Sequence, residues 1–211
     1  MISHTAIDPL LARDIEALTV PGLLIGHRVI SAGDENALLD EEAASIVSPV
    51  LAVRRASGSA RIVARALLAQ LGYGRVAVPK GEAGEPFWPM GLTGSLAHDD
   101  RIAVAAVALQ RDIRAVGIDV EPAVPLTPDM LELIATPQEL RSIADDLLQG
   151  KFLFAAKEAV YKAVYPLDRM FLEFRDIEVD LTASKAVTRT GRRVALRICI
   201  SSHVVVVALP E

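Results

Sequence analysis

Long hydrophobic runs, cysteine and surplus positive charge are scarce in this sequence, and each scarcity excludes a class of protein. The longest apolar run spans residues 102–109, less than half of the about 20 residues that a bilayer span needs, so we expect no membrane helix. The stretch MISHTAIDPLLARDIEALTV has no basic leader before an apolar block, which predicts no signal peptide and a cytoplasmic protein. The single cysteine, Cys199, fits a reducing compartment, and we expect it to be a small buried residue.

The charge balance argues against a nucleic-acid-binding protein. The net charge is −5, from 22 basic and 27 acidic residues, so any site for a polyanion must be local. With 211 residues, of which 52% are hydrophobic and 23% charged, the chain can build a sizeable core in one domain or in two small halves.

The segment VGIDVEP places two acids, Asp119 and Glu121, two residues apart in a predicted strand. Because side chains alternate along a strand, both carboxylates leave one face while Ile118 and Val120 leave the other. Carboxylates this close raise one another's pKa unless a cation lies between them, which suits Mg²⁺. The alternative is a strand end with two solvated acids before a proline-rich turn.

A basic helix is predicted over residues 53–71, where apolar residues recur at three-and-four spacing and Gly72 follows the last turn. Arg54, Arg61 and Arg65 lie near one flank of its buried stripe. This flank is either a solvated basic face or an anion clamp, because arginine offers forked donors to phosphate.

A long loop and a histidine follow this helix. Residues 73–94 are rich in glycine and proline and indicate a strand followed by a long loop. Residues 95–100 then look like a turn that delivers His98 to an apolar strand at 102–109. A lone histidine is more often structural than functional, and both roles stay open for His98 at this point.

A second long helix is predicted over residues 151–164. Its buried stripe comprises Leu153, Ala156, Val160, Ala163 and Val164. The opposite side is expected to carry Lys157, Glu158, Tyr161, Lys162 and Tyr165. Glu158 and Lys162 share a face, and on spacing alone they can be an ordinary surface pair.

The order of the remaining elements indicates a repeated architecture. Helices are predicted at 128–134 and 137–148, and alternating or continuous apolar strands fill the chain after residue 170. Both halves run from helices to strands and close on a valine-rich strand, AVAAVAL in the first and HVVVVAL in the second, which suggests a duplication.

Taken together, GIDVEP and FAAKEAVYKA resemble the paired signature of the 4'-phosphopantetheinyl transferase superfamily, whose members load carrier proteins with the arm of coenzyme A. The segments RRASGSARIVARALLAQLG, EPFWP and GSLAHDD follow the order seen in the enterobactin-synthesis, EntD-like (Sfp-type) branch. The resemblance covers roughly residues 50–180. It implies two similar α+β halves, residues 1–113 and 114–211, with the active site in the cleft between them.

The resemblance also assigns roles in the second half. It implies that Asp119, Glu121 and Glu158 ligate Mg²⁺ together with the pyrophosphate of coenzyme A, and that Lys162 contacts a phosphate. Glu158 is in addition our candidate for the base that activates the carrier serine. The implied partner is an apo acyl or peptidyl carrier protein, and the chain is expected to act as a monomer.

In the first half, the resemblance implies that Arg61 and His98 hold the ribose 3'-phosphate of coenzyme A and that Arg54 assists. Family members commonly have serine before the histidine, but this chain has Ala97, so one hydrogen bond to the phosphate is either missing or supplied by Ser95. Glu85 stands where a basic residue often precedes proline, which leaves Lys80 as the nearest substitute.

Two rival classes are weighed against this enzyme. The first is a catalytically degraded relative that binds coenzyme A or a carrier protein without transfer. The second is an α+β structural or interaction protein with incidental motifs, which would require three separate signatures to coincide.

Overall fold

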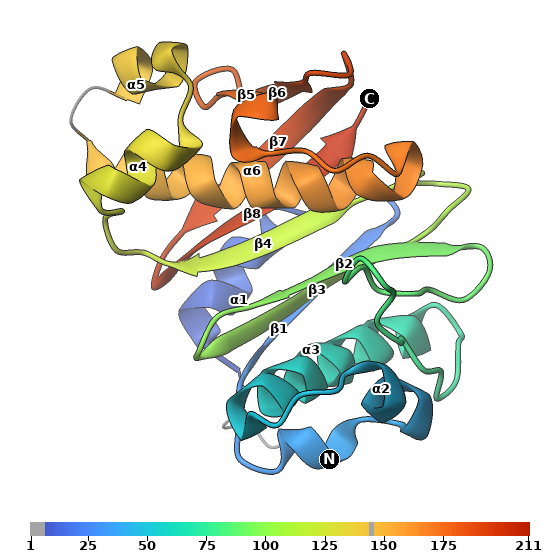
Figure 1. The fold of residues 1–211 in the computed structure, drawn as a ribbon. Coiled ribbons are helices and arrows are strands. Elements are labelled where there is room, and N and C mark those ends of the chain that lie inside the picture. Colours follow the sequence, from blue (N-terminus) through green and yellow to red (C-terminus); the bar gives the residue numbers. More distant parts are fainter. Residues whose placement is uncertain (1–6, 144–145) are drawn as a thin grey trace. The chain divides into compact units, whose positions relative to one another are not determined.

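A computed structural model describes residues 7–143 and 146–211 of the chain. These residues divide into two compact units, Met1–Arg114 and Ala115–Glu211. Each unit packs a long helix against an antiparallel sheet, so the predicted α+β class with two similar halves is confirmed (Figure 1). No helix among the described residues is long and apolar enough to cross a membrane.

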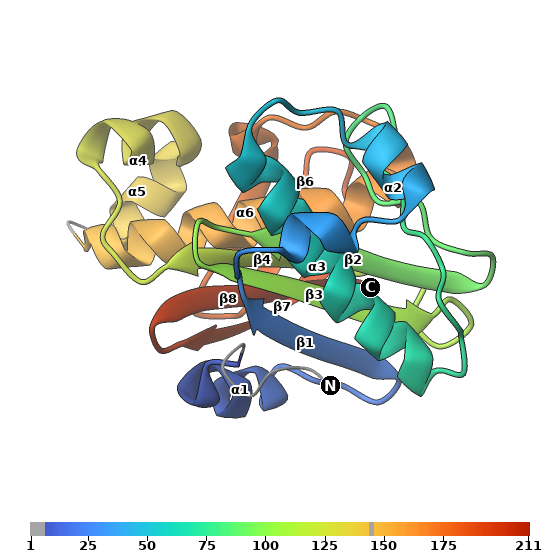
Figure 2. The same ribbon diagram turned by 90° about the horizontal axis from the view of Figure 1, so that it is seen from below.

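The first unit is built on a three-stranded sheet. Its strands are β1 (Leu23–Val29), β2 (Leu92–His98) and β3 (Ile102–Leu109), in the order β1-β3-β2. Its helices are α1 (Pro9–Glu16), the 3-10 helix η2 (Asp34–Ala37), α2 (Asp40–Ser45) and α3 (Leu51–Gln70). Helix α3 covers one face of the sheet through its apolar stripe, and α1 packs beside β1 (Figure 2).

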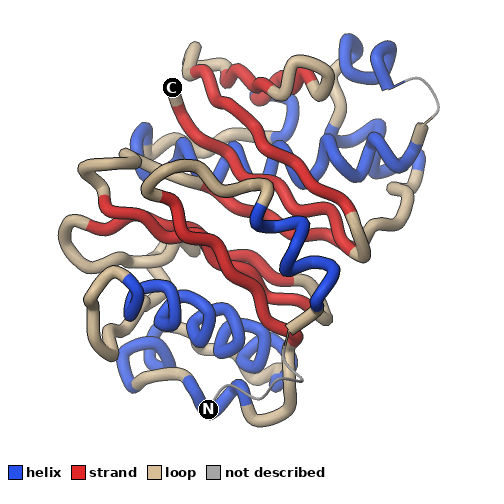
Figure 3. The backbone as a smooth tube through the Cα atoms, turned by 180° about the vertical axis from the view of Figure 1, so that it is seen from behind, coloured by secondary structure: helices blue, strands red, loops and turns tan. Residues whose placement is uncertain are grey.

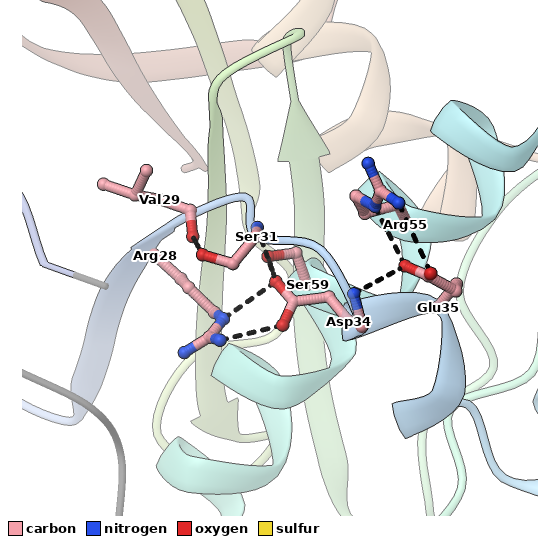
Figure 4. Close-up of polar contacts among 8 residues, drawn as sticks. Arg28, Val29, Ser31, Asp34, Glu35, Arg55 and Ser59 are labelled. Carbon is pink, nitrogen blue, oxygen red and sulfur yellow. Dashed lines mark hydrogen bonds and ion pairs between the residues drawn. The ribbon is translucent and has the colours of Figure 1, made fainter. Parts of the chain in front are cut away.

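A close approach of η2 to α3 explains two residues of the basic helix. A Cβ atom on Gly58 would lie 2.0 Å from the carbonyl oxygen of Asp34, so only glycine fits there. The buried Asp34 side chain accepts hydrogen bonds from Arg28 (2.8 and 3.0 Å), from the hydroxyl of Ser59 (2.7 Å) and from the backbone of Ser31 (Figure 4). Burial alone would raise the pKa of Asp34, but these hydrogen bonds lower it, so the carboxylate stays charged and holds η2 on α3.

The second unit is built on a five-stranded sheet. Its strands are β4 (Gly117–Pro122), β5 (Ile177–Asp180), β6 (Lys185–Thr188), β7 (Arg193–Ile200) and β8 (His203–Pro210), in the order β4-β8-β7-β6-β5. Figure 3 shows the strands of both units in red, seen from behind. Its helices are α4 (Pro128–Ile134), α5 (Pro137–Ile143), α6 (Leu147–Asp168) and the 3-10 helix η3 (Phe174–Asp176). The predicted buried stripe of α6 is confirmed, because each of its members is fully buried.

Gly117 brings β4 into close contact with α6. A Cβ atom on this residue would lie 1.9 Å from the carbonyl oxygen of Ala159, which no side chain can tolerate. Strand β4 can therefore lie directly against the helix. Two residues further along the strand, Asp119 reaches the side chains that α6 carries on this face.

Four expectations about secondary structure and burial differ from the structure. Residues 73–91 contain no described strand beyond an isolated bridge between Lys80 and Pro86, because their glycines and prolines interrupt any ladder. Ser95 lies inside β2 instead of a turn, since small residues were taken for turn residues in a strand that pairs fully with β3. Cys199 is only half-buried in β7. The predicted helix at 137–148 ends as α5 at Ile143, and two of its residues, 144–145, lie outside the described part.

Candidate functional site

The second unit brings acidic and basic side chains together on β4 and α6. Lys162 of α6 donates a hydrogen bond of 2.6 Å to Oδ1 of Asp119 on β4. Lys151, seven residues before Glu158 on the same helix, donates one of 3.0 Å to Oε2 of Glu121. The lysine that sequence spacing paired with Glu158 therefore donates to an acid of the strand.

Asp119 is the most perturbed carboxyl group of this set. It is 4% exposed, and its Oδ2 atom is buried with no hydrogen-bond partner among the described residues. Burial raises the pKa of Asp119 to about 7 although Lys162 opposes the change, and the charges of Glu121 and Glu158 raise it further. The three predicted carboxylates thus act on one another electrostatically.

Lys157 does not lie where the sequence analysis placed it. It is fully buried, and its ammonium group donates to Glu139 (2.7 Å) and to the carbonyl oxygens of Ile134 and Phe174 (both 2.9 Å). The spacing of Leu153, Lys157, Val160 and Val164 does put Lys157 on the buried stripe, but its charge was taken as a sign of exposure. Lys157 ties α4, α5 and η3 to α6, directly beside Glu158.

An apolar pocket of about 640 Å³ adjoins Glu158. Its walls come from α4, α6 and the segment around η3, and Tyr161 and the exposed Phe171 form an edge-to-face ring pair within it. Lys157 lines the same pocket, so the clamp that it forms also shapes the space beside the predicted base.

The first unit brings together Arg61, Lys80 and His98. All three line a pocket of about 470 Å³ between the end of α2, α3, the 80–86 loop and the end of β2. Arg61 is 5% exposed, donating from Nε to the carbonyl of Val78 (2.8 Å) and from Nη1 to that of Ser57 (3.2 Å). Burial lowers the pKa of Arg61 to about 10, so the guanidinium stays charged at neutral pH.

The other two arginines of the predicted basic flank have different positions. Arg54 is exposed on the first turn of α3 and is not among the described residues that line the pocket. Arg65 donates to both carboxylate oxygens of the buried Glu42 (2.8 Å each) and to the carbonyl of Ala37. The flank is therefore neither a uniform solvated face nor a simple clamp.

Both departures from the family pattern can be located in the structure. Ser95 lies two residues before Ala97 on β2 and shares a face of the strand with it, and Ser95 is not among the residues that line the described pocket. Glu85 does not line the described pocket, because its carboxylate lies against Gly81, where a Cβ atom would be 2.6 Å from Oε2. Lys80 and Pro86 on either side of it do line the pocket.

The ion pairs near the two pockets include three residues for which the sequence predicted no such contact: Glu42, Glu139 and Lys151. Both glutamates occupy the third position of a short helix, where their side chains accept the backbone N–H of Leu39 and Thr136. That capping pattern was visible for Glu139, but the partners of all three residues are remote in sequence, and no local spacing predicts them.

The carboxylates do not converge as a preformed metal cage. Among the described residues, no group of three Asp, Glu, His or Cys side chains is arranged to hold a metal ion. Lys162 and Lys151 instead neutralise Asp119 and Glu121. The donor chemistry still fits a divalent cation, because Oδ2 of Asp119 is a buried carboxyl oxygen without a partner among the described residues, and two further carboxylates act on it electrostatically.

Comparisons with known proteins identify the family. Residues 115–208 match the 4'-phosphopantetheinyl transferase superfamily, and residues 41–108 match the 4'-phosphopantetheinyl transferase N-terminal domain. The chain is 34% identical over 173 residues to 4'-phosphopantetheinyl transferase Svp of Streptomyces mobaraensis, an alignment that covers 78% of this chain and 70% of Svp. The chain therefore belongs to the 4'-phosphopantetheinyl transferase superfamily.

Two further relatives refine this placement. The chain is 42% identical over 129 residues to 4'-phosphopantetheinyl transferase Npt of Nocardia iowensis, covering 60% of this chain and 58% of Npt. It is 34% identical over 113 residues to enterobactin synthase component D of Escherichia coli K12, covering 50% of this chain and 53% of that protein. The resemblance to the enterobactin-synthesis branch is thereby confirmed, although the alignments span little more than half of these two relatives.

Proposed function

We propose that the protein transfers the 4'-phosphopantetheine arm of coenzyme A to a serine hydroxyl of an apo acyl or peptidyl carrier protein and releases adenosine 3',5'-bisphosphate. The observation that supports this most is the set of Asp119, Glu121, Glu158 and Lys162 on β4 and α6. Membership of the family and the separate pocket with Arg61, Lys80 and His98 agree with it.

The carboxylates fit the Mg²⁺ that the family resemblance implies. Asp119, Glu121 and Glu158 would hold the ion, and the buried oxygen of Asp119 without a partner among the described residues is the donor that most needs a cation. When bound, Mg²⁺ would neutralise charge on the pyrophosphate of coenzyme A.

Glu158 and Lys162 would then act on the reacting atoms. Glu158 accepts the proton of the carrier serine, the serine oxygen forms a bond to the phosphorus that bears the pantetheine arm, and the bond from that phosphorus to the bridging oxygen breaks. The Lys162 ammonium has N–H groups beyond the one that bonds Asp119, and these would donate to the pyrophosphate. There they would stabilise the negative charge that accumulates as the bridging oxygen departs.

The pocket of the first unit would bind the nucleotide end of coenzyme A. Arg61 offers a charged fork and His98 a ring N–H to the ribose 3'-phosphate, and Lys80 adds a flexible cation. Arg54, which is exposed, keeps only the assisting role that the family resemblance implies.

Mass spectrometry tests the function directly. A panel of apo carrier proteins is incubated with the protein, Mg²⁺ and coenzyme A, and a phosphopantetheine adduct is expected on at least one carrier. A matched incubation with Glu158→Ala should leave every carrier unmodified. Binding of coenzyme A without modification of any carrier would favour a catalytically degraded relative instead.

A further inference from the structure

A buried carboxylate in the first unit lies behind the pocket that holds Arg61. Glu42 is fully buried on α2 and accepts four hydrogen bonds: two from Nη1 of Arg65 (2.8 Å each), one from the backbone of Val78 (2.9 Å) and one from that of Leu39 (2.9 Å). It lines no part of the described pocket and has no role in the proposed chemistry. Its contacts nevertheless join α2, α3 and the segment that leads to Lys80.

Val78 connects this carboxylate to Arg61. The N–H of Val78 donates to Oε1 of Glu42, and the carbonyl of the same residue accepts from Nε of Arg61 at 2.8 Å. The orientation of the guanidinium therefore depends on a residue whose own position is set by Glu42.

A second connection runs through the end of α2. The hydroxyl of Ser45 donates to the carbonyl of Glu42 (2.9 Å) and accepts the backbone N–H of Lys80 (2.9 Å). The backbone of Glu42 is thus linked to Lys80 through Ser45, as its carboxylate is linked to Arg61 through Val78.

Geometry and charge predict opposite effects of removing the Glu42 carboxylate. Loss of a negative charge beside Arg61 and Arg65 would strengthen the field that attracts an anion. However, all four hydrogen bonds to the Glu42 carboxylate come from N–H donors. A glutamine at this position would replace one carboxylate oxygen by an NH₂ group, which is itself a donor, so at least one of the four hydrogen bonds would be lost. Because Glu42 and Val78 are both fully buried, no water from bulk solvent can easily replace that bond.

We propose that Glu42 is a positioning residue for the phosphate pocket: it holds Val78, and through Val78 the guanidinium of Arg61, in the orientation that distinguishes a nucleotide with a 3'-phosphate from one without. This inference rests on the proposed function, because it takes the 3'-phosphate of coenzyme A as the ligand of Arg61. Glu42 itself does not touch the nucleotide.

The second unit supplies a matched control. Glu139 is also a buried capping glutamate, and it also accepts a helix-start N–H (Thr136), a cation of the long helix (Lys157) and a strand N–H (Val179). Glu139→Gln should disturb the fold in the same way as Glu42→Gln, but without a link to Arg61.

The test compares binding of adenosine 3',5'-bisphosphate and AMP by isothermal titration calorimetry, without carrier protein or turnover. The wild-type protein is expected to bind the bisphosphate more tightly, and Glu42→Gln should reduce this preference about tenfold or more. Glu139→Gln should leave the preference unchanged. If Glu42→Gln keeps or increases the preference, or if both variants reduce it equally, Glu42 has no positioning role.

A milder variant covers the case in which Glu42→Gln fails to fold. Glu42→Asp keeps the charge but shortens the side chain by one methylene, so it should lose the hydrogen bond from the N–H of Val78 and reduce the preference by about threefold, the scale of one hydrogen bond. An unchanged preference in a folded Glu42→Asp protein would then overturn the proposal. A wild-type protein with no preference would instead show that the 3'-phosphate site of the proposed function is wrong, and the proposal would fall with it.

Discussion

The two units contain the same arrangement, here called a clamp: a buried glutamate of a short helix accepts hydrogen bonds from a cation of the long helix and from a backbone N–H. The cation differs between the two units. In the first, Glu42 of a short helix accepts from Arg65 of the long helix α3 and from the backbone of Val78. In the second, Glu139 of a short helix accepts from Lys157 of the long helix α6 and from the backbone of Val179. This correspondence supports the duplication that the valine-rich strands suggested.

The residues next to each clamp differ in chemistry. Arg61 precedes Arg65 by one helical turn and lines a pocket with Lys80 and His98, whereas Glu158 directly follows Lys157 and acts electrostatically on Asp119. Under the proposed function, the same arrangement would support anion binding in one unit and acid–base chemistry in the other. The cation that contacts the buried glutamate is arginine in the first unit and lysine in the second.

The largest expected effect is the loss of transfer activity when a carboxylate of the second unit is removed, while nucleotide binding by the first unit is unchanged. Asp119→Ala and Glu158→Ala should each lower transfer by about a thousandfold or more, because each removes a group proposed to act at the reacting phosphate. Neither should weaken binding of adenosine 3',5'-bisphosphate, which is measured by calorimetry on the same preparation. Near wild-type turnover of either variant at saturating Mg²⁺ would rule out the shared carboxylate site.

The next effect concerns the stability of the clamps. Lys157→Met leaves a buried carboxylate and two buried carbonyls without their donor, and should lower the free energy of unfolding by about 3–5 kcal/mol in urea denaturation. Arg65→Met should cost less, because besides the Glu42 carboxylate it leaves only one carbonyl, that of the half-buried Ala37, which water can reach. Equal losses would show that the two clamps contribute equally to the free energy of unfolding, which would contradict this expectation.

A smaller effect on kcat is expected from substitution of Lys162, and it distinguishes a structural role of this lysine from a catalytic one. If this lysine neutralises charge on the pyrophosphate, Lys162→Met should lower kcat about a hundredfold, and Lys162→Arg should restore little of it because a planar fork replaces a compact ammonium poorly. If it only neutralises Asp119, stability should fall and kcat should not. Both quantities are measured on one preparation, and an intact kcat would leave Glu158 as the functional residue of α6.

The sequence predicted the elements well and the long-range contacts poorly. Periodicity located α3, α4, α6 and the apolar strands, and alternation put Asp119 and Glu121 on one face of β4. The family and its enterobactin-synthesis branch were predicted from motif order and are confirmed by the comparisons.

The failures share one physical cause. Lys157 follows the apolar spacing of α6, yet its burial depends on acceptors from three other elements that no local pattern reveals. Glu42 and Arg65 are equally remote from each other along the chain. Ser95 was misplaced because small residues suit both a turn and a tightly packed strand.

The most direct test of the division between binding and transfer is the ratio of kcat/KM on coenzyme A to kcat/KM on 3'-dephospho-coenzyme A, measured for wild type, Arg61→Ala and Lys162→Met. Only coenzyme A carries the 3'-phosphate, so Arg61→Ala should lower this ratio about tenfold or more through KM. Lys162→Met should lower both values together and leave the ratio unchanged. A ratio that Arg61→Ala does not move, or that Lys162→Met moves as strongly, would contradict the account.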